Sequence, residues 1–568
     1  MTGAELSMMR NAPPVELPEK YYLDYFESLL GFVEEKCGSL LSRREKNFYR
    51  RFRGLPEEAR CLFVRLTNRK GCYFRLGKLS YTEVPDPEAT AVLLCERKFL
   101  ISLSPRHATD ISEIMCLFPK AELLALLKQL DADWLKGRRT LKKPDLVAQA
   151  ADHFNGGQLI SIIRRQETVV RVCCEAEVEM LRFLYFGDIN SDMTQFVVRD
   201  MGIVKTETFD ESKLRPYFST RREAEDKLRI SKAYRDFKVM RDEQLAPADS
   251  IYEWFVAQAI ARAQFCEPAW PLFDKLALRL GKLLEQQKHP DFALRVYQHT
   301  QKPPARERCV RLMHKLGLKD DALGLCDAII GDPQNAEEHY FAQDFRDRIR
   351  RKKRTKRTTD FLKNSDCIEL EEDRRHYVEG GVLEYYQRLG YQGIHAENYL
   401  WRSFFGLLFW DIIFDEDCEA LHHPMQIAPT DFYTPKFLTK RKPQLQERLK
   451  VLDHPDRFYN IIQHHYETKV GMSNPLVGWH ESILPLVAQC YESLEGEQVR
   501  RVLLEMARDL KENTKGFPDL FVWRDSTYHF IEVKSPNDHL SAQQLHWLTF
   551  FRKLDIRAEV IRVCWKSD

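Results

Sequence analysis

The stretch FPDLFVWRDSTYHFIEVKSPNDHLS, residues 517–541, contains two short apolar segments separated by a turn, with a carboxylate in or beside each. LFVW and YHFIEVK are rich in β-branched and aromatic residues, and RDST is a plausible four-residue hairpin connection between them. We therefore expect two antiparallel strands. Because side chains alternate along a strand, Phe530, Glu532 and Lys534 share one face, and pairing across the turn brings Asp519 toward the same end.

Two carboxylates this close together repel each other unless one is protonated or a divalent cation binds between them. Mg²⁺ or Mn²⁺ suits the all-oxygen set of Asp519, Glu532 and a backbone carbonyl, and Lys534 beside them would orient the attacking water and offset phosphate charge. The pattern predicts a metal site for phosphodiester hydrolysis. The alternative is a surface hairpin with an ordinary Glu/Lys pair. The order P-D, hairpin, E-V-K, helix LSAQQLHWLTFFRKL and strand AEVIRVCW favours the nuclease.

The composition is that of an ordinary globular protein with several domains: 568 residues, 44% of them hydrophobic and 30% charged. A net charge of +2 means that any nucleic-acid contact must use local basic patches. The 14 cysteines include no CxxC pair, and the N-terminus MTGAELSMMRNAPP lacks an apolar signal region, so we expect a reducing cell interior. FFGLLFWDIIF, residues 404–414, is too short to span a bilayer and contains Asp411, so it predicts a buried helix and no membrane segment.

Residues 1–105 are predicted to form an N-terminal helical domain with a small strand pair, compatible with a winged-helix module. Within it, RREKNFYRRFR, residues 43–53, mixes cations with aromatic residues. This segment is either a solvated helix face with its aromatic side chains inward or a DNA contact, and the sequence leaves both open.

Residues 106–155 read as helix, basic loop and helix, a layout that resembles the SAP motif, a two-helix DNA-binding element. Arg138, Arg139, Lys142 and Lys143 cluster on the connector, where flexible cations could reach phosphates. Basic helix connectors also occur in proteins that do not bind DNA. We take these four residues as candidate DNA-binding residues.

Residues 156–365 are predicted to form a helical region with repeats of the tetratricopeptide kind. Two of its segments echo each other, with Leu294 matching Leu323 and each leucine following an alanine. The basic run RRKKRTKR, residues 350–357, is interpreted as a solvated linker. Residues 366–568 are assigned to the nuclease domain with its helical lead-in.

Residues 516–564 resemble a VRR-NUC domain of the PD-(D/E)XK nuclease superfamily. Together with GIHAENYLWRSFFGLLFWDIIFDED, residues 393–417, and the SAP-like and repeat-like regions, the chain resembles the Fanconi-anaemia-associated nuclease family over most of its length. The resemblance implies a mainly α-helical front half followed by a C-terminal α/β PD-(D/E)XK nuclease domain.

The same resemblance implies the site residues. The glutamate of the GIHxE segment, Glu397, would join Asp519, Glu532 and the carbonyl of Val533 in binding Mg²⁺ or Mn²⁺, with Lys534 as the catalytic lysine. Without the resemblance, Glu397 is a helix-start glutamate that interacts favourably with the helix dipole.

Gln544 matches a glutamine that the family has near its active site, and it is a candidate catalytic residue. Ser541 and Gln544 also fit a capping box at a helix start, and both interpretations stand. His395, His464 and His465 are interpreted as structural or surface residues, because the site already has hard-ion ligands.

The resemblance implies a 5′-flap endonuclease and 5′-to-3′ exonuclease that acts on branched or flapped double-stranded DNA in interstrand-crosslink repair. The rivals are a Holliday-junction resolvase-like enzyme and a non-catalytic DNA-binding scaffold. Animal members carry a ubiquitin-binding zinc finger, and no Cys/His cluster for one exists in the sequence, so we expect a bacterial-type member without ubiquitin binding. His539 stands where animal relatives have an arginine. The expected location is the bacterial cytoplasm near the nucleoid, or the nucleus if the chain is eukaryotic.

Overall fold

The computed structural model of the protein describes residues 17–242, 247–259 and 265–566. These residues form two compact units. One contains the described residues up to Met201 together with Pro216–Ala224, and the other contains Gly202–Arg215 and the described residues from Glu225 onward. The mainly helical chain ends in a mixed α/β domain, which confirms the predicted fold class.

The first unit begins with helices that share an aromatic core. Phe48 and Phe52 of the basic helix are buried and pack against Phe63 and Phe99, so the basic segment turns its aromatic side chains inward. The elements of this unit are α2 (Tyr21–Cys37), α3 (Arg43–Arg53), α4 (Glu57–Thr67), β1 (Tyr73–Arg75), α5 (Pro87–Glu96), β2 (Leu100–Ser102), α6 (Ile111–Cys116), α7 (Lys120–Leu130), α8 (Lys143–His153), α9 (Gly156–Gln166), β3 (Val169–Val172), α10 (Glu175–Phe186) and α11 (Thr194–Asp200).

A three-stranded antiparallel sheet ties the residues that follow α8 to this unit. Strand β3 lies between β1 and β2 and pairs with both. The finer division of the chain into 1–105, 106–155 and 156–365 stays a prediction, and the compact unit continues to Met201. The reason is that the central strand of the sheet comes last along the chain, after the SAP-like helices.

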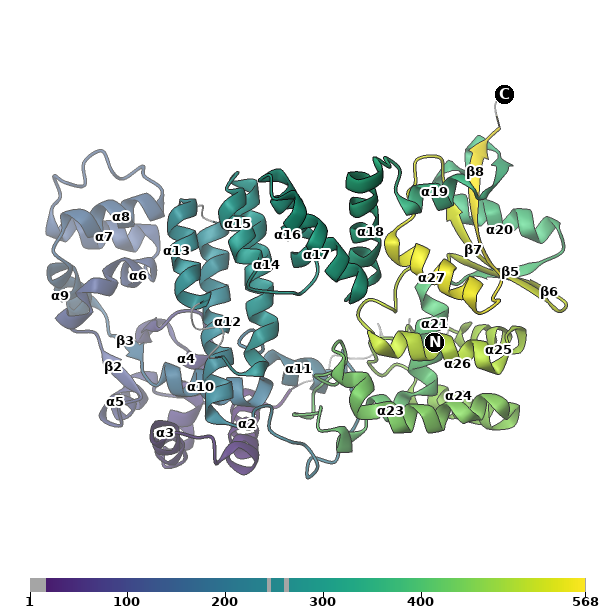
Figure 1. Cartoon of the computed structure of the whole chain (residues 1–568). Coiled ribbons are helices and arrows are strands. Elements are labelled where there is room, and N and C mark those ends of the chain that lie inside the picture. Colours follow the sequence, from purple (N-terminus) through teal and green to yellow (C-terminus); the bar gives the residue numbers. More distant parts are fainter. Residues whose placement is uncertain (1–16, 243–246, 260–264, 567–568) are drawn as a thin grey trace. The chain divides into compact units, whose positions relative to one another are not determined.

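The second unit starts with a row of helices that Figure 1 shows side by side: α13 (Ala248–Ala259), α14 (Trp270–Gln286), α15 (Pro290–Tyr297), α16 (Ala305–Lys315), α17 (Lys319–Gly331) and α18 (Ala336–Arg351). Helices α14 and α15 approach closely because Gly281 lacks a side chain, and a Cβ there would lie 2.6 Å from the Tyr297 ring. Leu294 and Leu323, the two leucines of the sequence echo, lie on α15 and α17, the second helices of two successive hairpins.

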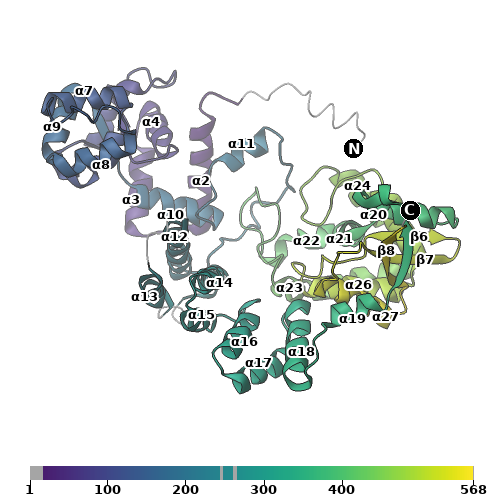
Figure 2. The same ribbon diagram turned by 90° about the horizontal axis from the view of Figure 1, so that it is seen from above.

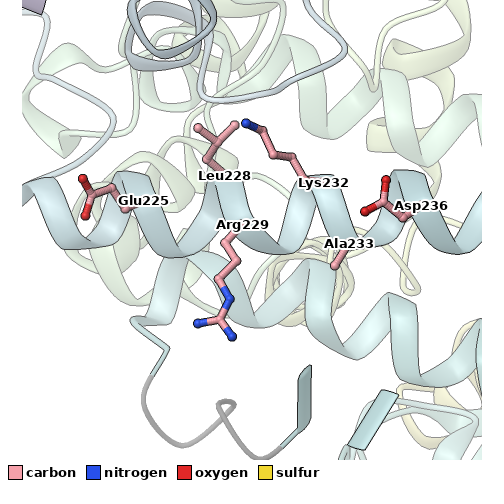
Figure 3. A pocket seen from close by; sticks show the side chains of 6 residues that line it. All are labelled: Glu225, Leu228, Arg229, Lys232, Ala233 and Asp236. Atoms are coloured by element: carbon pink, nitrogen blue, oxygen red, sulfur yellow. The ribbon is translucent and has the colours of Figure 1, made fainter. Parts of the chain in front are cut away.

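Helix α12 (Arg221–Asp242) runs from the first unit into the second and bears an open pocket along one side (Figure 3). The pocket is lined by Glu225, Leu228, Arg229, Lys232, Ala233 and Asp236. Two acidic and two basic side chains give it no dominant sign of charge, so it does not have the character of a phosphate site.

The C-terminal domain is built on a five-stranded sheet in the order β4-β8-β7-β6-β5. Strands β4, β8 and β7 are parallel, and β6 and β5 are added in antiparallel fashion. Its elements are α19 (Arg357–Lys363), β4 (Asp366–Leu370), α20 (Val378–Arg388), β5 (Gln392–His395), α21 (Glu397–Leu408), α22 (Trp410–Ile413), α23 (Lys436–Arg448), α24 (Pro455–Lys469), α25 (Ile483–Ser493), α26 (Gly496–Arg508), β6 (Leu520–Arg524), β7 (Thr527–Lys534), α27 (Ala542–Lys553) and β8 (Ala558–Trp565).

Helices cover both faces of this sheet, as Figure 2 shows. On one face, Val382 of α20 packs with Val522 and Ile531. On the other, the rings of Trp401 from α21 and Phe551 from α27 pack on Phe530. Burial of both faces explains why the strand segments read as nearly continuous apolar runs.

The hairpin between β6 and β7 is tighter than the sequence predicted. Arg524 and Thr527 are paired, so the turn contains only Asp525 and Ser526 instead of the four residues RDST. Asp525 takes a left-handed backbone conformation with φ of 51°, which aspartate tolerates better than most residues.

The apolar segment of residues 404–414 forms the end of α21 and all of α22 and is largely buried, as predicted. Asp411 is paired with Arg448. In the part of the chain that the structure describes, no helix is both long and apolar enough to cross a bilayer.

One cysteine pair is joined by a disulfide. Cys367 on β4 and Cys564 on β8 have Cα atoms 6.7 Å apart and are separated by 197 residues in the sequence. No local sequence pattern marks this pair, because the two cysteines become neighbours only when β4 aligns with β8.

The basic run of residues 350–357 begins in the last turn of α18, ends at the first residue of α19 and has acidic partners at both ends. Arg357 pairs with Asp344 and Asp347, and Arg350 pairs with Asp327. Most side chains of the run are exposed, as a solvated linker requires, and ion pairs hold its two ends.

A buried arginine links segments that follow α21 through hydrogen bonds and an ion pair. Arg441 is fully buried, donates from Nε to the carbonyl of Ile412 at 3.0 Å, and pairs through Nη1 with Asp431 at 2.8 Å. We expect Arg441→Met to lower the free energy of unfolding of this region by about 3–5 kcal/mol, because it removes the close cation of the buried Asp431 carboxylate and leaves only Lys440, at 3.9 Å. Urea unfolding followed by tryptophan fluorescence measures this change. Arg441→Met combined with Asp431→Leu should recover part of the loss, and a single variant as stable as the wild type would contradict the expectation.

Candidate active site

The register of the β6–β7 hairpin places the two predicted acids together. Leu520 pairs with Ile531, so Asp519, just before β6, lies opposite Glu532. Asp519 Oδ2 accepts the backbone N–H of Val533 at 2.8 Å. The strand that carries Glu532 therefore also fixes the carboxylate of Asp519.

Glu532 is fully buried, yet only one of its carboxylate oxygens has partners. Oε1 lies 2.6 Å from the Lys534 ammonium and accepts a hydrogen bond from Gln544 Nε2. Oε2 is buried and has no hydrogen-bond partner. An orphaned buried carboxylate oxygen costs free energy, and in a native protein it calls for a proton or a cation.

The raised pKa values of Glu532 and Asp519 also indicate that the site needs a proton or a cation. Burial raises the pKa of Glu532 to about 8, and the neighbouring charge of Asp519 adds to the shift. Burial also raises the pKa of Asp519 to about 6, an effect strengthened by Glu379 and Glu397 and opposed by Lys534. A hard divalent cation such as Mg²⁺ or Mn²⁺ would relieve both the repulsion and the missing contact, so the residues present fit such an ion.

Glu397 comes to the same place from a distant part of the sequence. The backbone N–H groups of Ala396 and Glu397 donate to the carbonyl of Asp519 at 2.8 and 3.0 Å. Glu397 is the first residue of α21 and has φ of 28°, which is rare for a residue other than glycine and is often found at functional sites. Its Oε1 accepts a hydrogen bond from Asn398 Nδ2 at 2.8 Å.

The structure confirms the capping box of Gln544, and the same side chain contacts Glu532, while a catalytic role stays a prediction. Ser541 Oγ accepts the Gln544 N–H, and Gln544 Oε1 accepts the Ser541 N–H, which completes a capping box at the start of α27. The amide nitrogen of the same side chain donates to Glu532. The cap therefore holds Gln544 in the orientation that contacts the site.

Glu379, in the first turn of α20, is a residue that the sequence analysis missed. Its charge helps to raise the pKa of Asp519, and its carboxylate lies 3.6 Å from Nδ1 of His395. Nothing in its local sequence distinguishes it from other charged residues. His465, as predicted, has a structural contact, with Nδ1 2.6 Å from the carbonyl of Leu407.

The four predicted DNA-binding residues differ in whether their side chains form hydrogen bonds within the protein. Lys143 donates to the carbonyl of Cys116, and Arg138 donates to Trp134 and Gln149. Arg139 and Lys142 are exposed, and within the described residues neither side chain has a hydrogen bond or an ion pair.

Two family models match the chain. Residues 20–101 match the model described as "FAN1, HTH domain", and residues 453–565 match the VRR-NUC domain. The first covers helices α2 to α5 with β1 and the start of β2, and the second covers the hairpin with Asp519 and Glu532.

Curated relatives match over long stretches. The Fanconi-associated nuclease 1 homolog of Pseudomonas aeruginosa is 27% identical over 566 residues, which cover 97% of each chain. The homolog of Arabidopsis thaliana is 27% identical, covering 96% of this chain and 67% of its own. Human Fanconi-associated nuclease 1 is 35% identical over 193 residues, 33% of this chain and 19% of its own length.

The fold also matches a solved structure described as paFAN1 bound to DNA with a two-nucleotide 5′ flap and a gap. The TM-score is 0.80 at 26% identity, and the match covers 98% of this chain and all of that one. Together with the acidic hairpin, these similarities confirm the resemblance seen in the sequence. The chain contains a VRR-NUC domain and is similar over almost its whole length to Fanconi-associated nucleases, and with this domain it is a DNA nuclease.

Proposed function

We propose that this nuclease cuts branched DNA at 5′ flaps, combining 5′-flap endonuclease with 5′-to-3′ exonuclease activity, and that it acts in interstrand-crosslink repair in the bacterial cytoplasm. The observation that carries the proposal is the group of Asp519, Lys534 and Gln544 around the buried carboxylate of Glu532, whose Oε2 has no partner. The similarity over almost the whole chain to a protein determined with 5′-flap DNA supports the choice of substrate.

Each site residue has a role in this proposal. Asp519, Glu532, Glu397 and the carbonyl of Val533 hold Mg²⁺ or Mn²⁺, which when bound lowers the pKa of water and stabilises charge on the phosphate. In the described residues no three His, Cys, Asp or Glu side chains already enclose a metal-sized space, so water and phosphate oxygens would complete the ligand set, as is usual for Mg²⁺.

Lys534 and Gln544 act on Glu532. Both contact Oε1, so they hold the carboxylate in one orientation and leave Oε2 free for the ion. Lys534 also places a positive charge where the attacking water and the phosphate meet. Arg139 and Lys142, with the partly engaged Arg138 and Lys143, would contact phosphates of a duplex arm.

The test is cleavage of end-labelled 5′-flap, 3′-flap, four-way-junction and single-stranded DNA with Mn²⁺, Mg²⁺ or EDTA. We expect cutting that requires the metal and is concentrated near the 5′-flap junction. Symmetric cutting of the four-way junction would favour a resolvase instead, and DNA binding without cutting under any condition would favour a scaffold.

Metal binding should release a proton. Below pH 8 the metal-free site holds a proton on Glu532, since its pKa is raised to about 8, and an ion needs the carboxylate form. At pH 7 we expect release of about one proton per Mn²⁺, and an affinity that rises by up to about tenfold per pH unit as the pH approaches 8. Titration calorimetry in buffers of different ionisation enthalpy measures this release.

The control for proton release is Glu532→Gln, which has no titrating group at that position and should show none. At pH 9 the wild type should also release almost no proton from this group. Binding heats at pH 7 that do not depend on the buffer would contradict the expectation.

A further inference from the structure

Tyr377 is an exposed aromatic residue at the edge of the acidic site. Its side chain is 56% exposed, and its hydroxyl lies 3.1 Å from Nε2 of His395. His395 precedes Glu397 by two residues and pairs across the sheet with Leu520, the neighbour of Asp519. The His395 side chain therefore lies between the Tyr377 hydroxyl and the strand end next to Asp519.

The ring is held on two sides. A Cβ on Gly380 would lie 1.7 Å from the Tyr377 ring, so the ring lies against the first turn of α20 in space that only glycine leaves. On the other side, the His395 ring is 5.7 Å from the Tyr377 ring and its Nδ1 faces Glu379. An exposed tyrosine fixed in this way loses little further side-chain entropy when it binds a ligand.

The surroundings of Tyr377 favour an uncharged contact. The nearby cations Arg374 and Arg375 are already paired with Glu384 and Glu372. Near a group of carboxylates, an aromatic face offers a nucleobase an attraction that does not depend on charge. Core packing does not explain the position, because more than half of the side chain remains exposed.

We propose that Tyr377 is a stacking platform for a nucleobase next to the phosphate that is cut, held in place by Gly380 and by the His395–Glu379 pair. The inference rests on the proposed function, since it takes DNA as the substrate of the Asp519 site.

The experiment places 2-aminopurine at each nucleotide beside the mapped cut site of the 5′-flap substrate and records its fluorescence with the full-length protein in EDTA, where no cutting occurs. We expect binding to change the fluorescence at one of these positions, and Tyr377→Ala to remove the change and weaken binding by about 5- to 50-fold. Tyr377→Phe keeps the ring and should bind within about twofold of the wild type.

Two further variants complete the design. Tyr377→Leu keeps an apolar side chain without a ring and should resemble Tyr377→Ala. Tyr385→Ala removes a tyrosine about 12 Å farther along the same helix and should leave the fluorescence change intact. Thermal unfolding of each variant shows that the fold is retained.

Two results would overturn the proposal alone: binding and fluorescence of Tyr377→Ala equal to the wild type, or a loss in Tyr377→Phe as large as in Tyr377→Ala. The second would assign the effect to the hydroxyl and His395 instead of to stacking. A wild-type protein that does not cut flap DNA with Mn²⁺ or Mg²⁺ would overturn the proposed function and this inference with it.

Discussion

Asp519→Asn is expected to slow cleavage of 5′-flap DNA by at least about 10³-fold, equivalent to about 4 kcal/mol of transition-state stabilisation. The amide keeps the size of the side chain and an oxygen that can accept the Val533 N–H, the contact that fixes Asp519 in the structure. It lacks the negative charge that a divalent cation requires. The fold and the DNA affinity should therefore persist while the chemistry is lost.

Single-turnover cleavage with excess protein measures this effect, and fluorescence anisotropy in EDTA measures the affinity, which should change by less than about twofold. The control is Asp525→Asn, which removes a carboxylate from the turn of the same hairpin and should cut at the wild-type rate. An Asp519→Asn protein within tenfold of the wild-type rate would contradict the assignment of the site.

Lys534→Met is expected to lower kcat by about 10²- to 10⁴-fold with little change in KM, as is typical when a positioned proton-transfer or charge-stabilising group is removed. Methionine retains most of the apolar stem of the nearly buried lysine, but no ammonium remains 2.6 Å from Glu532 Oε1. Because the charge of Lys534 lowers the pKa of Glu532, its removal should raise that pKa further. The residual activity should therefore reach its maximum at a higher pH than in the wild type.

A pH series of kcat and KM checks both parts of this expectation. Lys553→Met, at the exposed end of α27, removes the same charge away from the site and should leave the profile unchanged. Equal activity of Lys534→Met and the wild type would remove Lys534 from the mechanism, and a changed rate with an unmoved pH profile would separate its charge from the titration of Glu532.

The sequence predicted the β6–β7 hairpin and the proximity of its charged side chains, because that information is local. Asp519, Glu532 and Lys534 lie within one pair of strands, where alternation and pairing fix which side chains meet. Glu397 could be proposed only from the family resemblance. Its link to Asp519 is a pair of backbone hydrogen bonds between segments far apart in the chain, and no local pattern encodes such a contact.

Features that depend on packing between distant segments could not be predicted from the sequence. The strand β3 returns to the first sheet after the SAP-like helices, which moves the boundary of the unit to Met201. Glu379 reaches the site only because α20 packs beside β5 and β6. For Gln544 the sequence offered a family match and a capping box as separate interpretations. In the structure the same side chain completes the cap and donates to Glu532.

The order of strands in the nuclease sheet has a consequence during protein synthesis. Strand β4, made early, has β8 as its neighbour in the sheet, and β8 is made after the entire catalytic hairpin. When translation stops after β7, the chain contains every acid of the site. It lacks β8, the strand that lies between β7 and β4 in the sheet. We expect such a nascent chain to lack the rigid sheet that aligns the acids, so that interrupted translation does not release a fragment able to cut the genome.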